Sequence, residues 1–134
     1  MKYIILLCTC CLFLNSCSDS DGRLILVNKT NKTIGFIDEK KERNDSIPSL
    51  SLCDQTKLYT VSPNNELMII SFSDWDVYFK HFPTNLLRVY IINNDTLSKY
   101  GTCEVIKQQM FIKRFDYTYD ELKNINWRIV FDGK

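Results

Sequence analysis

The 134-residue sequence has few of the residues from which catalytic and metal sites are built. It contains one histidine and four glycines, and it has no G-x-S-x-G segment. A zinc site needs three or four His, Cys, Asp or Glu ligands, and phosphate-binding loops need closely spaced glycines. A serine hydrolase needs a nucleophile elbow. We therefore predict no metal and no cofactor, and no motif assigns a catalytic residue.

A surplus of charge of one sign is also absent. The chain has 17 Lys and Arg against 16 Asp and Glu, and the first 16 residues contribute only Lys2, so the remainder has 16 of each sign. Proteins that bind nucleic acid usually present a basic patch or stripe. The balance therefore predicts no nucleic-acid partner.

Long apolar runs are missing except for one of twelve residues at the start, residues 3–14. A membrane-spanning helix needs about 20 apolar residues, so this run is too short to span. A short apolar segment preceded by a positive charge, here Lys2, is typical of an export signal. We predict that residues 1–16 are a signal peptide.

The segment Leu14-Asn15-Ser16-Cys17 resembles a bacterial lipobox, in which the cysteine thiol receives a diacylglycerol and becomes the new N-terminus. Two or more acyl chains, such as palmitate, hold a protein stably on a membrane. Residues 17–22 are then the acylated cysteine and a flexible tether, and their Ser/Asp pattern resembles the export signal of surface lipoproteins of the Bacteroidetes type. The expected location is the outer membrane at the cell surface, with its periplasmic face as the alternative.

Only Cys53 and Cys103 remain once the signal is removed and Cys17 is acylated. Exported proteins lie in oxidising compartments, where two such thiols form a disulfide. The alternative is that each packs as a small apolar residue in the core.

Residues 23–134 are predicted to form a single β-rich domain. Apolar alternation and turn residues indicate strands at 23–28, 33–39, 57–61, 66–72, 86–93, 110–117 and 126–131. The first two are expected to form a hairpin, 40–49 a loop, 66–72 a central strand and 94–96 a turn, while 97–108 is ambiguous. The expected fold is mainly β, an antiparallel β-sandwich, Ig-like or related, with one or two short helices.

Two short helices are predicted. Aromatic residues at helical spacing follow Ser73, which is placed to cap a helix, and Pro83 is placed to end it; they are Trp75, Tyr78, Phe79 and Phe82. These rings are expected in the core, with a sugar-stacking platform as the alternative. Thr118 and Glu121 have capping-box spacing and open a helical turn through residue 124. Arg114 and Asp116 are expected to form an ion pair.

The segments NDTLSKY (94–100), IKRFDYTYDELKNINWRIVF (112–131) and SDWDVYF (73–79) resemble those of small lipoproteins common in gut Bacteroidetes. The resemblance implies a secreted, lipid-anchored domain and supplies no catalytic residue. Two further segments, Asp45-Ser46-Ile47 and Asp95-Thr96-Leu97, resemble the O-glycosylation sequon known in those bacteria, which predicts glycans on Ser46 and Thr96. The alternative is that both are Asx-type turns.

These features favour a non-catalytic binding or interaction module attached to the membrane, with a glycan or a protein as its ligand. A small glycan-processing hydrolase is the first alternative, with Asp74 and Asp76 as its carboxylates or His81 as its base. Next to a helix start the two aspartates more often cap the helix, and His81 has no positioned partner in the sequence, which indicates a surface residue. An envelope immunity or inhibitor protein is the second alternative.

Overall fold

The computed structural model describes residues 20–42, 53, 59–71, 74–81 and 85–134. The predicted signal peptide, Cys17 and Ser46 lie outside the described residues. Within the described ranges, none of the helices is both long and apolar enough to cross a membrane.

Three strands form the first sheet, which we call sheet A. Its central strand is β1 (Asp21–Asn28), which pairs antiparallel with β4 (Glu66–Ser71) and parallel with β7 (Arg128–Phe131). Inward-facing residues alternate with outward-facing ones, as the pleat of a strand requires. The inner face is aliphatic and aromatic, and it includes Leu24 and Leu26 of β1.

Four antiparallel strands form the second sheet, sheet B. The order is β3 (Tyr59–Val61), β2 (Ile34–Glu42), β5 (Asn85–Asn93) and β6 (Lys113–Tyr117). β2 and β5 pair along their whole length, from Ile34 opposite Asn93 to Glu42 opposite Asn85. These two strands form the centre of the sheet.

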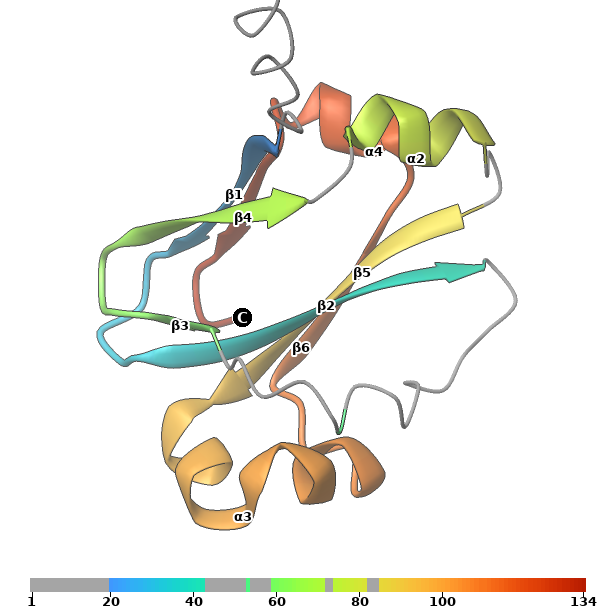
Figure 1. Cartoon of the computed structure of the whole chain (residues 1–134). Helices are drawn as coiled ribbons and strands as arrows, with labels where there is room; N and C mark the ends of the chain where they lie inside the picture. The colour runs from blue at the N-terminus through green and yellow to red at the C-terminus, as the bar shows by residue number, and fades with distance from the viewer. Residues whose placement is uncertain (1–19, 43–52, 54–58, 72–73, 82–84) are drawn as a thin grey trace, which may run out of the picture.

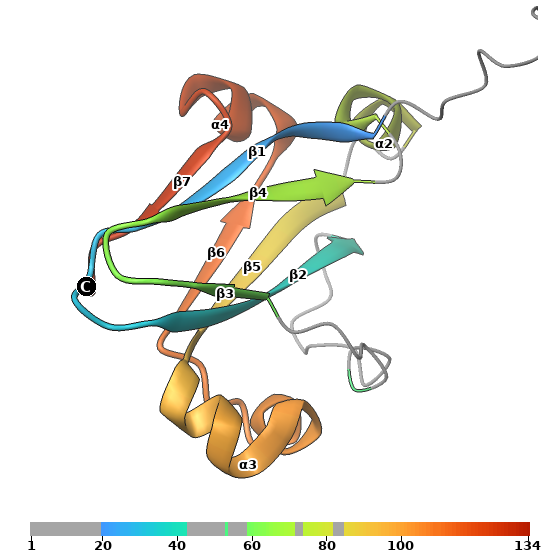
Figure 2. The same cartoon turned by 60° about the vertical axis from the view of Figure 1, so that its left-hand side comes forward.

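The main hydrophobic core lies between the two sheets and takes residues from both, as well as from the short helices at one end (Figures 1 and 2). Its fully buried members include Leu24, Leu26, Phe36, Trp75, Leu87, Val89, Ile91, Leu122 and Ile129. The fold is therefore mainly β, built from two sheets that share one core.

Helix α3 (Asn94–Lys107) covers the outer face of sheet B, where a second apolar cluster forms. Members of the cluster come from β2, β5 and α3: Ile37, Tyr90, Ile92, Leu97, Val105 and Ile106. Asn93 caps the helix, its side-chain oxygen accepting a hydrogen bond from the Asp95 backbone N–H at 2.8 Å. Gly101, at φ 74°, interrupts the helix with a kink.

Two shorter helices, α2 (Trp75–His81) and α4 (Tyr119–Asn124), lie together at the opposite end of the molecule from α3 (Figure 1). The predicted capping box of α4 is confirmed: the Thr118 side chain accepts from the Glu121 N–H, and the Glu121 carboxylate accepts from the Thr118 N–H at 2.7 Å. Helix α2 is confirmed as well. Its predicted cap and stop residues, Ser73 and Pro83, lie outside the described residues.

The predicted hairpin of residues 23–28 and 33–39 is wrong, because its two strands belong to different sheets. The buried Asn28 side chain holds the crossing between them. Its Nδ2 donates to the carbonyl oxygens of Lys32 and Val61, at 2.8 and 3.0 Å, and its Oδ1 accepts from the Thr30 N–H. The connection thus bends out of the plane of one sheet and into the other.

The prediction that 66–72 is a central strand is also wrong. β4 lies at an edge of sheet A, and its outward-facing Met68 and Ile70 are 54% and 56% exposed. A strand that is apolar on both faces suggests burial on both faces. Here the inner face packs on the core while the outer face does not.

Several boundaries differ from those predicted, including the start of β1 at Asp21 instead of residue 23 and the start of β7 at Arg128 instead of residue 126. Helix α3 takes in the ambiguous residues 97–107 and also residues 94–96, which were expected to form a turn, because Asn93 caps the helix just before them. β2 continues to Glu42 into the predicted loop, since β5 pairs with it throughout. β6 begins at Lys113, three residues after the predicted start. The parallel β1–β7 pair also departs from the purely antiparallel expectation.

The predicted ion pair of Arg114 and Asp116 is confirmed, with 3.3 Å between Nη2 and Oδ2. Asp116 also accepts from the buried Arg88, at 2.7 Å from its Nε. Arg88 lies between Glu39 and Asp116 in the register of β2, β5 and β6. This row of alternating charge accounts for the guanidinium buried on the outer face of sheet B.

Candidate binding site

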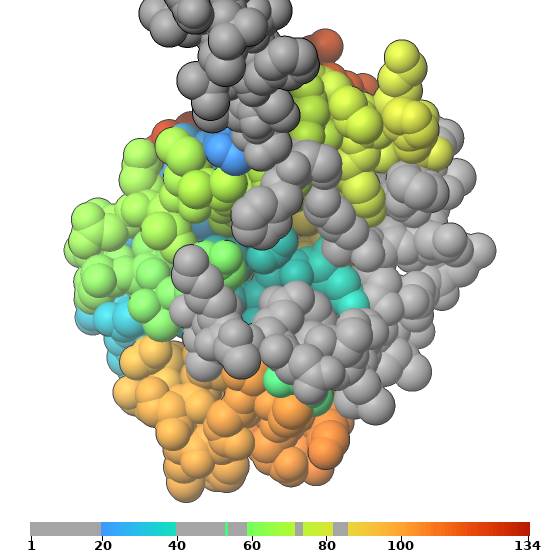
Figure 3. All heavy atoms as spheres, in the orientation of Figure 1, coloured from blue at the N-terminus to red at the C-terminus, as the bar shows by residue number. Residues whose placement is uncertain are grey.

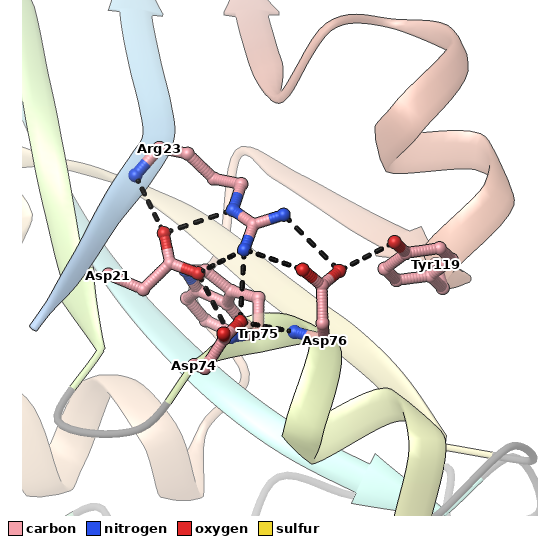
Figure 4. Close-up of polar contacts among 6 residues, drawn as sticks. All are labelled: Asp21, Arg23, Asp74, Trp75, Asp76 and Tyr119. Atoms are coloured by element: carbon pink, nitrogen blue, oxygen red, sulfur yellow. Dashed lines mark hydrogen bonds and ion pairs between the residues drawn. The ribbon is translucent and has the colours of Figure 1, made fainter. Parts of the chain in front are cut away.

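Arg23 lies at the centre of a cluster of three aspartates at the α2–α4 end of the molecule (Figure 4). Its Nε donates to Asp21 Oδ1 at 3.0 Å, and its Nη2 lies 2.9 Å from both Asp74 Oδ1 and Asp76 Oδ2. Its Nη1 also donates to Asp76, at 3.2 Å. One guanidinium therefore binds carboxylates from the start of β1 and from the start of α2.

The same aspartates also hold the beginning of α2. Asp74 Oδ1 accepts from the Asp76 backbone N–H at 2.8 Å, and Asp21 Oδ2 accepts from the Trp75 N–H at 3.0 Å. The first N–H groups of a helix have no partner within the helix, and carboxylates are favoured there by the helix dipole. Asp74 thus caps α2, which confirms for this residue the expectation that an aspartate next to the helix start acts as a cap.

Aromatic rings enclose the cluster on its other side. The Arg23 guanidinium carbon lies 4.8 Å from the centroid of the Trp127 ring, within the range of a cation–π contact. The Tyr119 hydroxyl, from α4, donates to Asp76 Oδ1 at 2.5 Å. The cluster thereby links β1, α2, α4 and the residue preceding β7.

The charges change the acidity of each partner. Hydrogen bonds from Arg23 and then from Tyr119 lower the pKa of Asp76 below its usual value. Burial alone would raise the pKa of Asp21, but the bonds from Arg23 and from the Trp75 N–H lower it. Hydrogen bonding to Asp21 and Asp76 raises the pKa of Arg23. At neutral pH both carboxylates are ionised and the guanidinium is charged.

A pocket of about 410 Å³ opens beside the cluster, between α2 and α4. Its walls are the rings of Phe79 and Tyr119, whose centroids are 5.6 Å apart, and its polar groups come from Asp76, Lys80 and Asp120. Small-molecule sites typically have volumes of about 300 to 1,000 Å³, with apolar walls and a few polar groups. The pocket has the size and the composition of such a site.

The predicted carboxylate pair, Asp74 and Asp76, is brought together, but both bind Arg23. A glycosidase of this kind needs one carboxylic acid with a raised pKa to protonate the leaving group. The pKa of Asp76 is lowered instead. His81 is exposed, and its Nδ1 lies 2.9 Å from the Val77 carbonyl oxygen in its own helix.

The aromatic residues predicted for α2 divide between core and pocket. Trp75 is fully buried and Phe79 is 5% exposed, while Tyr78 packs against the same core cluster. Phe82 lies outside the described residues. The core interpretation is therefore confirmed for the described rings, and Phe79 additionally contributes one edge of the pocket wall.

The remaining predicted sites lie elsewhere. Cys53 and Cys103 are both half-buried and are thiols in the structure; Cys53 packs against the cluster to which α3 contributes, and Cys103 lies on α3. Thr96 is half-buried in the first turn of α3. It is not in the loop that was expected to carry a glycan.

Arg23 and Asp21 were missed by sequence reasoning. Asp21 and Gly22 were assigned to the tether, yet they begin β1, and Gly22 packs so closely on Met68 that a Cβ would lie 2.4 Å from the Met68 sulfur. The available signal was an aspartate two residues before an arginine at a strand start, which suggests a local ion pair. This local pattern did not indicate that both residues also contact the start of α2, some fifty residues further along the chain.

Within the part of the chain that the structure describes, no three His, Cys, Asp or Glu side chains are grouped so that they would hold a metal ion. In comparisons with known proteins, no family model, no curated protein and no solved structure matches this chain.

Proposed function

We propose that this chain is a lipid-anchored protein of the outer membrane that binds a glycan in the pocket between α2 and α4. The support for an anchor is the apolar segment 3–14 followed by the lipobox-like residues 14–17. Display at the cell surface is favoured by the Ser/Asp residues after Cys17. A two-sheet sandwich, Ig-like or related, suits a binding role because it supports loops and short helices at its ends.

The observation that carries the binding proposal is the composition of the pocket. Sugar rings combine an apolar C–H face, which packs on aromatic rings, with hydroxyls that hydrogen-bond to charged groups. The half-buried ring of Tyr119 offers the aromatic surface, beside the small part of Phe79 that is exposed. Asp76 and Asp120 offer acceptors, and Lys80 offers a donor. The engagement of Asp74 and Asp76 by Arg23 favours binding over hydrolysis, because neither is placed as a free acid.

The experiment is a glycan array probed with the soluble form of the domain. It compares glycan binding by Asp120→Ala with binding by the control variant Asp95→Ala. Both aspartates are exposed and lie in the first turn of a helix, so each removal costs a similar few tenths of a kcal/mol from the helix dipole. Of these two aspartates, Asp120 lines the pocket and Asp95 does not. We expect a loss of glycan affinity of about ten- to a hundredfold for Asp120→Ala and none for Asp95→Ala, since a lost hydrogen bond to a charged group is worth about 1.5 to 3 kcal/mol.

Equal binding by the two variants would contradict the proposed site. Release of reducing sugar from a bound glycan would instead support the hydrolase alternative.

A further inference from the structure

The outer face of sheet A is apolar and bears no helix in the described parts of the chain. Met68 and Ile70 on β4 and Val130 on β7 are 54%, 56% and 40% exposed, which makes them among the most exposed large apolar side chains described. Between them lie the partly buried Ile25 and Val27 of β1. We call these five residues the open face.

The position of the open face in the sheet follows from the strand register. Ile25 pairs with Met68 across the β1–β4 ladder, and Val27 pairs with Val130 across the β1–β7 ladder. Glu66 on β4 and Arg128 on β7 lie on the same side and form an ion pair with each other. Arg23 precedes Ile25 on this side of β1, and its guanidinium is bonded to Asp21, Asp74 and Asp76 at the end of the sheet. The apolar side chains of the open face are thus bordered by charged groups that already bind one another.

The chain that leads to Cys17 enters this same sheet through its central strand. Four peptide steps separate Cys17 from Asp21, and extended chain covers at most about 3.3 to 3.6 Å per residue, so the reach is about 14 Å. Asp21 is held in place by Arg23 and the Trp75 N–H. In Figure 3 the start of β1 (blue) reaches the surface beside the atoms of β4 (green).

From these observations we propose that the open face rests on the lipid bilayer that carries the acyl chains of Cys17. The inference rests on the proposed lipid anchor and adds to it a fixed orientation of the domain. The short tether holds sheet A at the membrane, and apolar side chains at an interface are favoured where they leave water for the boundary of the acyl region.

A second copy of the chain is the less suitable occupant. Stable protein interfaces bury about 800 Å² on each partner. The open face offers five side chains, of which Ile25 and Val27 are already partly covered. A patch of this size falls within the range of the largest apolar patch on an ordinary monomer, a few hundred Å².

The proposed orientation predicts which parts of the domain lie far from the lipid. Packed sheets are about 10 Å apart, and α3 lies beyond sheet B, on the side away from sheet A (Figure 2). Residues on α3 should therefore lie roughly 20 Å further from the membrane than the open face, given a second layer spacing of similar size.

The experiment measures the depth of two fluorophores on the acylated full-length protein in vesicles of phosphatidylethanolamine and phosphatidylglycerol. Cys53 and Cys103 are replaced by serine, and one dye is attached at Val130→Cys or at Ser98→Cys, an exposed position on α3. Lipids that carry a nitroxide near the headgroup serve as quenchers. We expect several-fold more quenching at position 130 than at position 98.

The double variant Met68→Glu/Ile70→Glu should abolish the quenching at position 130 while flotation with the vesicles is retained. The matched control is Tyr100→Glu/Ile112→Glu, which changes two exposed apolar positions away from the open face. It should leave the quenching at position 130 unchanged.

Equal quenching at 130 and 98 in protein that floats overturns the orientation alone. Loss of flotation by the parent protein overturns the anchor and the orientation together. A dimer of the unacylated domain that Met68→Glu/Ile70→Glu dissociates would assign the face to a second copy and overturn the proposal.

Discussion

Arg23 contributes to the structure through the particular geometry of its side chain. A guanidinium presents five N–H donors in a planar fork, and here they serve Asp21, Asp74 and Asp76 while the plane contacts Trp127. A lysine ammonium is a point charge with three donors on a flexible stem and cannot match this arrangement. Arg23 thus joins the start of β1 to the start of α2, and α4 is linked to the same cluster through the hydrogen bond from Tyr119 to Asp76.

Replacing Arg23 with methionine should lower the free energy of unfolding by about 1 to 3 kcal/mol, because three carboxylates lose their common cation. This loss in the free energy of unfolding is smaller than for a fully buried pair, because the Arg23 side chain is 34% exposed and solvent screens part of the electrostatic interaction. Arg114→Met is the matched control, since its ion pair with Asp116 is 47% exposed on the arginine side and should cost about 0 to 1 kcal/mol. Urea unfolding compares the two, and equal losses would contradict the assigned role.

The acid dependence of stability provides a second measurement on the same variant. The pKa of both Asp21 and Asp76 is lowered in the folded state, so their contribution is fully present above the unfolded value of about 3.9 and is lost as the pH falls through the folded value. Between about pH 5 and pH 2 the melting temperature of the parent protein should therefore fall more steeply than that of Arg23→Met. Parallel curves would show that Arg23 does not set these pKa values.

Among the elements, α3 is the one that its own sequence pattern predicts least well. The kink at Gly101 divides it, and its buried residues are only Leu97, Val105 and Ile106. An apolar stripe broken by a glycine does not keep the 3.6-residue period that identifies a helix. Tertiary packing on Tyr90 and Ile92 of β5 is what defines the helix.

Helix α3 places the two cysteines on one side of sheet B. Cys103 lies on it, and Cys53 packs against the cluster beneath it, so both thiols belong to the same side of sheet B. We expect oxidation to join them once the proposed signal peptide has directed the chain to an oxidising compartment. A disulfide over fifty positions (103 − 53) would add about 4 kcal/mol by the chain-entropy model, provided that the two Cα atoms approach within about 7 Å.

Alkylation of the denatured, unreduced domain measures the outcome. A bridged pair takes up no label, whereas two labelled thiols would establish that each cysteine packs as a small apolar residue. The single variants Cys53→Ser and Cys103→Ser serve as controls, because each should expose one thiol.

For the molecule as a whole, the proposed membrane attachment depends on the segment before β1. Cys17→Ser should abolish acylation and release the protein from membranes, because Cys17 is the one residue to which the lipobox interpretation assigns the lipid. The measurement is sedimentation with membranes and metabolic labelling with a fatty acid. A serine variant that still partitions with membranes would contradict the lipobox interpretation.

Surface display is tested with Asp19→Ala rather than with a change at Asp21. Asp21 binds Arg23 and the Trp75 N–H, so its removal would also weaken the fold. Asp19→Ala should leave acylation intact and reduce digestion by protease added to whole cells. Unchanged digestion would favour the periplasmic face.

Local patterns in the sequence were sufficient for several features. The alternation in 128–131, the spacing of Thr118 and Glu121, and the aromatic period of 75–79 each involve residues within one or two turns of each other, so the chain determines them without reference to the rest of the fold. Residues 126 and 127, which were predicted to begin the last strand, instead form a turn before it, with φ of 52° and 59°. The mainly β character follows from the same short-range information.

Only the tertiary structure decided how these pieces meet. Contacts between distant segments decide that β1 pairs with β4 and β7 and not with β2. They also decide that β4 lies at an edge of its sheet. The pattern within a single strand does not encode these contacts. The same is true of the site: Arg23 meets Asp76 only because β1 and α2 adjoin at one end of the shared core, and Tyr119 reaches that carboxylate from α4. The sequence by itself determined most of the strands and the two short helices, whereas tertiary packing determined α3 and the neighbours of each strand.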